Sequence, residues 1–334
     1  MRCRLKVITP LHIGSGLRIP RSGYVINGGR FHRVDLERLF EGLEERGYTG
    51  DRLLEMFREI EERGEWPSDL KSMAARYTDY SLKHDQDFIG RAREVNEIIK
   101  SAGKFYVPGS SIKGSILSAI HWFALKRVSE VPRGRKEVED ILLGYRRKGA
   151  REHLLERVLG EITGQSSDSR FARWISVTDS NLVGSECAAV VSGNVLGGRR
   201  AVNLSYEVVV PGCEFEVEIK CLGSKLSEKE ILGITDDFYS RILEEEKSWI
   251  ERTRVTAELG EIEDKKYKIR IGQGSSSLST SLLVLAKELG GRVCERYLRE
   301  WRVARGREGP KTRKLVNYMG RRWMMGWCAL QPVS

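Results

Sequence analysis

The chain has 334 residues, of which 40% are hydrophobic and 31% are charged, and its formal net charge is +10. This composition is typical of a globular, soluble protein, and the length suffices for two domains. No apolar run is long enough to span a bilayer, and Arg2, Arg4 and Lys6 interrupt the start with charges that a secretory signal peptide excludes. We therefore expect a cytoplasmic protein.

The excess of Lys and Arg favours a nucleic-acid partner, although a surface rich in Glu and Arg is also typical of thermophilic proteins. The six cysteines lie far apart and form no C-x-x-C pair, so the sequence indicates neither a zinc site nor a redox motif. We expect most of them to be reduced, buried and small apolar residues. No cofactor and no metal are predicted.

The first elements are predicted to be strands followed by helices. Residues 2–9 alternate apolar and polar side chains, which predicts a half-buried strand with a basic outer face. Residues 24–34 predict a β-hairpin around Asn27-Gly28-Gly29, and Asp35 is the expected N-cap of a helix. From Asp51 to about Lys100 the pattern stays helical, which we interpret as a helical insertion.

Residues 104–121 (KFYVPGSSIKGSILSAIH) predict a short strand, a tight turn and an amphipathic helix. Ser110 or Ser111 can cap this helix, and Lys113 lies in its first turn beside free backbone N–H groups. Together these features predict an anion site, with phosphate as the expected anion. In a P-loop the lysine follows the last glycine, whereas Lys113 precedes Gly114, so nucleotide hydrolysis is not indicated. A purely structural strand–helix junction is the alternative.

The second half of the chain alternates strands and helices. We predict strands at 173–178, 188–191, 201–210, 213–221, 267–271 and 324–330. We predict helices at 136–147, at 151–162, after a capping box at Ser227–Glu230, and at 278–289. Between them lie a glycine/serine loop at 272–277 and an exposed basic loop at 308–314.

This alternation predicts an α+β fold of two ferredoxin-like domains related to the RRM fold. The first domain is predicted over residues 1–185, with the helical insertion at about 51–100. The second is predicted over residues 186–334, with the glycine-rich loop at 272–277.

Four stretches in this order resemble motifs of the RAMP superfamily of CRISPR systems. They are residues 9–16 (TPLHIGSG), 106–114 (YVPGSSIKG), 173–180 (RWISVTDS) and 272–277 (GQGSSS). Their order and spacing are most similar to the family of fifth Csm subunits in type III-A effector complexes, and the resemblance spans essentially the whole chain. It implies RNA-binding domains of ferredoxin-like type with a role in antiviral defence.

In that family the subunit caps the filament of backbone subunits near the 3′ end of the crRNA and supports crRNA 3′ maturation. The resemblance therefore implies three kinds of partner: crRNA, the other Csm subunits (above all the backbone RAMP subunit) and recruited host nucleases. It implies no membrane. Backbone subunits carry a target-cleaving Asp soon after their first strand, whereas Leu17–Gly23 (LRIPRSG) contains no acid. This difference favours a non-catalytic cap.

The resemblance and the local basic pattern together predict RNA contacts and no catalytic residue. Gly114 and Gly274 are expected to let RNA phosphates approach backbone N–H groups closely. The predicted RNA-binding residues are His12, Gly14, Ser15, Gly16, Ser110, Ser111, Lys113, Gly114, Arg270, Gly272, Gly274, Lys311, Arg313 and Lys314.

Each candidate for chemistry has a simpler interpretation. His12 is the best candidate for acid–base work, because some RAMP nucleases use a histidine without metal, but we favour a structural or phosphate-contacting role. Asp85 and Asp87 are interpreted as solvated surface rather than metal ligands. The basic loop with Lys311 is either a phosphate contact or a solvated loop. No row of stacking aromatics is evident, which favours sequence-independent contact with the RNA backbone.

Three hypotheses stay open. The first is a non-catalytic RNA-binding and assembly subunit. The second is a metal-independent crRNA-processing endoribonuclease of the same superfamily. The third is a phosphate- or nucleotide-binding α+β protein outside it.

Overall fold

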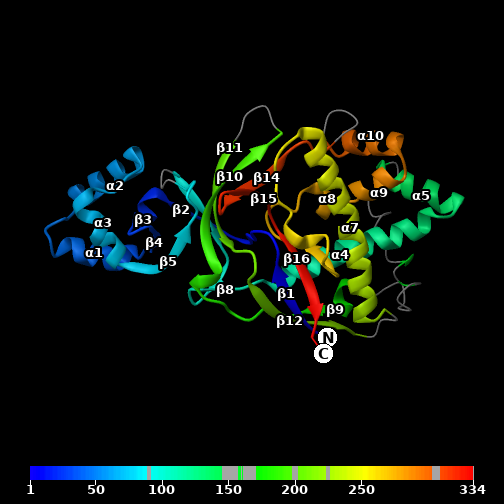
Figure 1. The fold of residues 1–334 in the computed structure, drawn as a ribbon, viewed down its shortest axis with the longest axis horizontal. Coiled ribbons are helices and arrows are strands. Elements are labelled where there is room, and N and C mark those ends of the chain that lie inside the picture. The colour runs from blue at the N-terminus through cyan, green and yellow to red at the C-terminus, as the bar shows by residue number, and fades with distance from the viewer. Residues whose placement is uncertain are drawn as a thin grey trace.

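The computed structural model describes residues 1–88, 92–144, 157, 158, 160, 171–197, 202–222, 226–302 and 309–333. Figure 1 shows two sheets and their helices, with a smaller lobe of three helices at one end of the long axis. The helix predicted over 151–162 lies outside the described residues except at 157, 158 and 160.

The first sheet contains five antiparallel strands in the order β13-β16-β1-β12-β9. The central strand β1 pairs through Leu5 with Phe215 on one side and Leu330 on the other. The alternation predicted for β1 is confirmed, since Cys3, Leu5 and Val7 are buried. The strand bounds are β1 Arg2–Val7, β9 Ile175–Val177, β12 Glu214–Cys221, β13 Lys268–Arg270 and β16 Trp327–Pro332.

Two long helices, α4 (Gly109–Ser129) and α7 (Glu228–Thr253), pack on each other and against this sheet (Figure 1). The predicted capping box of α7 is confirmed, because Ser227 Oγ accepts from Glu230 N and the Glu230 carboxylate accepts from Ser227 N. The elements β1, α4, β9, β12, α7 and β16 follow one another in the order β-α-β-β-α-β.

The second sheet contains nine strands. Its main path is β2-β6-β11-β10-β5-β4-β3, and β14 pairs with both β10 and β15. The predicted hairpin of β3 and β4 is confirmed, with Gly28 and Gly29 at φ values of 56° and 70° in its turn. The strand bounds are β2 Gly14–Pro20, β3 Tyr24–Asn27, β4 Arg30–Val34, β5 Thr78–His84, β6 Glu94–Ile98, β10 Ala188–Leu196, β11 Val202–Val209, β14 Arg313–Tyr318 and β15 Arg321–Met324.

The lobe consists of α1 (Leu36–Glu44), α2 (Asp51–Arg63) and α3 (Ser68–Arg76). Asp35 is the N-cap of α1 as predicted, and its carboxylate accepts from Arg38 N at 3.2 Å. The expectation that helices continue to about Lys100 is wrong, because β5 and β6 follow α3. In β5 the period is two, with Leu82 buried between more exposed neighbours, and pairing with β4 stabilises it as a strand.

Three shorter predictions are also revised. The strand before α4 is reduced to β8 (Lys104–Phe105), which pairs with β7 (Lys100–Ser101). The helix predicted at 278–289 is divided at Ser281, whose backbone is extended, into α8 (Ser277–Thr280) and α9 (Leu283–Glu288). The strand predicted at 324–330 starts only at Trp327. The remaining described helices are α5 (Pro132–Leu142) and α10 (Gly291–Glu300).

The fold class is α+β, as predicted. The division into domains 1–185 and 186–334 stays a prediction. Strands from both sides of residue 185 share each large sheet, since β1 pairs with β12 and β5 pairs with β10. Within the described part of the chain, no helix is long and apolar enough to cross a membrane.

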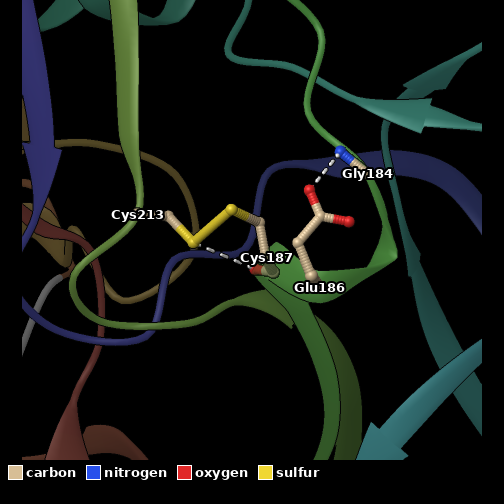
Figure 2. The surroundings of a disulfide bond; sticks show 4 residues. All are labelled: Gly184, Glu186, Cys187 and Cys213. Carbon is tan, nitrogen blue, oxygen red and sulfur yellow. Dashed lines mark hydrogen bonds between the residues drawn. A yellow bond between two sulfur atoms is a disulfide. The ribbon is translucent and has the colours of Figure 1, made fainter.

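A disulfide joins Cys187, just before β10, to Cys213, just before β12 (Figure 2). Val210 N also donates to Cys187 O at 2.9 Å, so the disulfide and a backbone hydrogen bond join the same two segments of the chain. It is the place where the chain passes from the second sheet to the first. This disulfide was not predicted from the sequence. Cys3, Cys221, Cys294 and Cys328 are not in disulfides.

We expect Cys213→Ser to lower the free energy of unfolding of the oxidised protein. The bond closes a loop with a sequence separation of 26, for which loss of chain entropy in the unfolded state gives about 3.5 kcal/mol. Denaturant unfolding with and without dithiothreitol measures this. The wild-type protein should fall to the stability of the variant when reduced. Equal stabilities under oxidising conditions would contradict the prediction.

Candidate functional site

A pocket of about 530 Å³ opens where the two sheets meet, between the loop before β2, the loop after β13 and the start of β14. It brings together five of the predicted site residues, Gly14, Gly272, Gly274, Arg313 and Lys314. Its lining residues are Ile13, Gly14, Val195, Gly272–Ser277, Pro310, Thr312, Arg313 and Lys314. No Asp or Glu is among these described residues, so the pocket suits an anion.

His12 holds the two loops together rather than facing the pocket. Its side chain is only 2% exposed, and its Nδ1 donates to Glu207 O at 2.7 Å, since a carbonyl oxygen can only accept. Burial is the main cause that lowers the pKa of His12 to about 4, and the charges of Lys314 and Lys100 add to it. The imidazole is therefore neutral at pH 7 and cannot act as a general acid, and its burial keeps it from a substrate, which supports the structural interpretation.

Glycine is required where the second loop touches the first. Gln273 N donates to His12 O at 2.8 Å, and a Cβ at Gly272, where φ is +71°, would collide with His12 O. At Gly274, where φ is +93°, a Cβ would lie 2.8 Å from the Cβ of Met325. The space that Gly274 leaves is therefore filled by Met325, and the expectation that a phosphate occupies it is revised.

The backbone of the second loop is largely satisfied inside the protein. The N–H groups of Gln273, Ser275 and Ser276 donate to His12 O, Gly272 O and Gly274 O. They are not available as a phosphate cradle. Ligand contacts of this loop then fall mainly to side chains such as that of Lys314, whose Nζ donates to Gln273 Oε1 at 2.7 Å.

The first turn of α4 already has an anion from the chain itself. Asp179 Oδ1 accepts from Gly109 N at 2.7 Å, which neutralises the positive end of the helix. The N-cap residue is Pro108, so neither Ser110 nor Ser111 is the cap as expected. Gly114 lies beyond the first four helical residues, so its N–H is bonded within the helix. Ser110 is exposed, and the Lys113 side chain is partly exposed.

The start of α4 nevertheless lies beside the pocket-forming segment. Ser115 Oγ donates to Arg270 O at 3.0 Å, and Arg270 is the last residue of β13, directly before the loop at 272–277. The loop at 272–277 therefore contacts the loop at 9–16 through Gln273 and His12, and the strand directly before it contacts α4 through Arg270 and Ser115. Ser110, Ser111, Lys113 and Gly114 do not line the pocket.

Arg270 and Arg313 were predicted as RNA contacts, but in this structure both are buried around one carboxylate. Arg270 Nη1 donates to Glu246 Oε1 at 2.6 Å, and Arg313 Nε donates to Glu246 Oε2. Glu246 is 0% exposed, Arg270 1% and Arg313 4%. The two guanidinium groups also lie 5.2 Å from the rings of Trp327 and Trp249. We reassign both arginines from direct contact to support of the pocket.

The remaining predicted contacts are exposed near the pocket rim. Gly14, Ser15 and Gly16 are exposed at the start of β2, where the pairing with β6 is irregular. Lys311 is also exposed, and its carbonyl oxygen accepts from Trp249 Nε1 at 3.0 Å. A flexible cation on a fixed backbone position is suited to an anionic partner.

Asp85 has a structural role rather than a solvated one. It is 5% exposed, and its carboxylate accepts from Asp87 N and from Met319 N in the turn between β14 and β15. In the part of the chain that the structure describes, no three His, Cys, Asp or Glu residues form a group that could hold a metal ion.

A buried hydrogen-bond network behind His12 was not predicted from the sequence. Glu207 is fully buried in β11 and accepts from Tyr80 OH and Lys100 Nζ, each at 2.6 Å, and from Ile98 N at 3.0 Å. Burial raises the pKa of Glu207, and Lys100 opposes this shift. The one signal in the sequence was an acid directly before the apolar pair Val208-Val209 of a predicted strand, which indicates a buried partner.

The predicted basic outer face of β1 is neutralised by its neighbour. Three pairs of opposite charge face each other across β1 and β12, namely Arg2↔Glu218, Arg4↔Glu216 and Lys6↔Glu214. Arg4 also forms an ion pair with Glu214 at 3.4 Å. This face of the first sheet is therefore a poor candidate for binding a polyanion.

Comparisons with known proteins agree on one family. The model of the RAMP superfamily matches residues 4–276. A curated protein of Methanocaldococcus jannaschii, the CRISPR system Cms protein Csm5, is 27% identical over 124 residues. That aligned stretch covers 36% of this chain and 30% of the relative.

Two solved structures share the fold. One is a chain from the cryo-EM structure of a Csm–crRNA–target RNA ternary complex of a type III-A CRISPR-Cas system. It has a TM-score of 0.75 at 24% identity and covers 99% of this chain and 100% of that chain. The other is the crystal structure of T. onnurineus Csm5. It has a TM-score of 0.67 at 21% identity, with 98% of this chain and 99% of that one covered.

We expect Glu246→Ala to destabilise the fold by about 3–5 kcal/mol, because it leaves two buried guanidinium groups without their carboxylate. The matched control is Glu245→Ala, which removes a partly exposed partner of Lys287 and should cost about 1 kcal/mol or less. Urea unfolding of both variants measures the difference. Equal losses for the two neighbours would show that the arginines do not depend on Glu246.

Proposed function

The chain belongs to the RAMP superfamily, and we propose that it is a non-catalytic crRNA-binding subunit of a type III-A CRISPR (Csm) effector complex. The observation that carries this proposal is the acid-free pocket where the loop at 9–16 meets the loop at 272–277, with Lys314 at its wall and Lys311 nearby. Both loops belong to the stretches that resemble the superfamily's motifs. The Csm5 relative and the fold of the ternary-complex chain support it.

The chemistry of the pocket favours the RNA backbone over its bases. Lysine is a point charge suited to phosphate, and Ser275–Ser277 add hydroxyl groups. No Phe, Tyr or Trp is among the lining residues that the structure describes, so stacking of bases in the pocket has no platform. Contact that tracks the strand without reading its sequence follows from this composition.

The proposal includes a place in the complex. The subunit caps the filament of backbone RAMP subunits near the crRNA 3′ end and supports 3′ maturation through recruited nucleases. One feature favours a cap: Leu17–Gly23 carries no acid where backbone subunits have their cleaving Asp. A cap presents only one of the two complementary surfaces that a filament needs, so we expect that the chain alone does not polymerise.

We also propose a domain plan, which differs from a division at residue 185 because its first unit combines strands from both sides of that residue. The β-α-β-β-α-β succession that ends in β16 is the ferredoxin-like core, and strand order β16-β1-β12-β9 fits it. The second ferredoxin-like unit is proposed within the nine-stranded sheet. The lobe of α1–α3 is then the helical insertion, shorter than the sequence indicated.

A catalytic role is the alternative, and His12 is the residue it needs. A general acid must carry a proton near neutral pH and reach its substrate. His12 is neutral, 2% exposed and bonded through Nδ1. These properties support the hypothesis of a non-catalytic subunit over that of a metal-independent endoribonuclease.

We expect the isolated protein to bind single-stranded RNA with little sequence preference and strong salt dependence. If about five phosphates are neutralised, log K falls against log[salt] with a slope of about −3.5. Lys314→Ala should reduce the magnitude of this slope by about 0.7. Filter binding over a salt series measures both.

The control is Lys229→Ala, an exposed lysine on α7 that lies about 25 Å along the helix from Glu246. Its slope should equal that of the wild type. A flat salt response, or binding of a mononucleotide but not of RNA, would instead support a general phosphate-binding protein.

We expect no cleavage of crRNA repeat RNA by the purified protein with Mg²⁺, with Mn²⁺ or with EDTA. The reason is the buried, neutral state of His12 and the acid-free segment Leu17–Gly23. Gel analysis of end-labelled RNA is the measurement. Cleavage that persists in EDTA and disappears in His12→Ala would establish the endoribonuclease alternative.

A further inference from the structure

The helical lobe is a unit with its own core at one end of the molecule (Figure 1). Leu39, Leu43, Ile60, Trp66 and Ala74 are among the buried residues of that core, which is separate from the main one. The face of α1 and α2 that points away from this core therefore adds nothing to folding by burial. Its composition is open to another use.

The lobe carries the opposite charge to the rest of the chain. Residues 36–76, the span of α1–α3, contain eleven Asp and Glu and seven Lys and Arg, a net charge of −4 within a chain of net charge +10. Two of the arginines are engaged locally, Arg38 with Asp35 and Arg63 with Glu59. Glu41, Glu44, Glu45 and Glu55 are exposed. An RNA strand is repelled from such a surface.

An apolar patch lies within this acidic surface. Leu54 is 68% exposed and Phe40 is 38% exposed. The ring of Phe40 lies 5.3 Å from that of Phe57, and Phe57 lies 6.1 Å from Trp66 of the lobe core. Leu54 precedes Phe57 by one helical turn, so the patch runs across both helices. An aromatic and aliphatic centre inside a charged rim is the composition of a protein interface.

We infer that the outer face of α1 and α2, centred on Phe40 and Leu54, docks a neighbouring protein whose contact surface is basic around an apolar depression. Charge complementarity selects this partner, because the exposed Glu41, Glu44 and Glu55 lie next to or within one helical turn of Phe40 and Leu54 and disfavour nucleic acid. The inference rests on the proposed function, in which the neighbour is another subunit of the complex. It adds that the acidic lobe, rather than the basic pocket, makes this protein contact.

Three variants of the lobe test the inference in the full chain. Phe40→Ser/Leu54→Ser removes the apolar centre, Leu54→Ser alone removes its most exposed part, and Glu41→Lys/Glu44→Lys reverses the rim charge. The matched control is Val131→Ser, which changes an apolar residue of similar exposure, 57%, before α5 at the other end of the molecule (Figure 1). Circular dichroism and thermal melts confirm that each variant is folded.

Each protein is mixed with the other Csm subunits and crRNA, and incorporation is measured by native mass spectrometry over a salt series. We expect at least a tenfold loss of incorporation for the double serine variant and a smaller loss for Leu54→Ser. The lysine variant should lose incorporation most at low salt, because steering by opposite charges is strongest there. The Val131→Ser control should match the wild type. RNA affinity of the isolated serine variants should stay within twofold of the wild type, and that of the lysine variant should not fall, because it removes negative charge that repels RNA.

Wild-type incorporation by the lobe variants would overturn the inference and leave the proposed function intact. Failure of the wild type to assemble, despite normal RNA binding, would overturn both the inference and the subunit role. Loss of RNA affinity in the lobe variants would place RNA on the lobe and also overturn the inference. Self-association of the wild type that the lobe variants abolish would assign the face to a second copy instead.

Discussion

One carboxylate inside the protein fixes the relation of the two sheets at the pocket. Glu246 of α7 accepts from Arg270 at the end of β13 and from Arg313 at the start of β14. Removing three charges from water is costly, and the cost is recovered only while every partner keeps its hydrogen bonds. A shift of either sheet would break them. The pocket therefore has a rigid wall on the side where Lys314 follows Arg313.

The loops at 9–16 and 272–277 are held in place by contacts with each other. His12 supplies the contact, with its ring bonded to Glu207 and its carbonyl oxygen bonded to Gln273 N. Gly272 and Gly274 are needed because backbone and side-chain atoms of the protein occupy the space beside them. Glycines that resemble a ligand-binding motif can thus be required by packing, with ligand contact left to neighbouring side chains.

Features that depend on a few adjacent residues were predicted from the sequence, whereas contacts between residues far apart in the chain were not. The alternation of β1, the turn at Gly28-Gly29, the Asp35 cap and the Ser227 capping box each depend on a few adjacent residues. Arg270 instead becomes buried only because α7 brings Glu246 to it, and the free end of α4 is occupied only because Asp179 arrives from 70 residues away. The sequence therefore could not show that Arg270 and Arg313 are buried around Glu246, and the RNA contacts themselves stay a prediction.

The distribution of charge differs between the pocket and the helical lobe. Arg270 and Arg313 form ion pairs with Glu246, and the basic side chains of β1 lie opposite the acidic side chains of β12. The net charge of +10 therefore overstates the positive charge that the pocket offers. With Lys314 at its wall and Lys311 nearby, the pocket can hold a polyanion only weakly at physiological salt, since each phosphate contact is screened. Such a protein binds its complex more tightly when a second surface also makes a contact, because the first contact raises the effective concentration for the second. In the proposed complex, an acidic face on a separate lobe would supply such a contact without competing for the RNA.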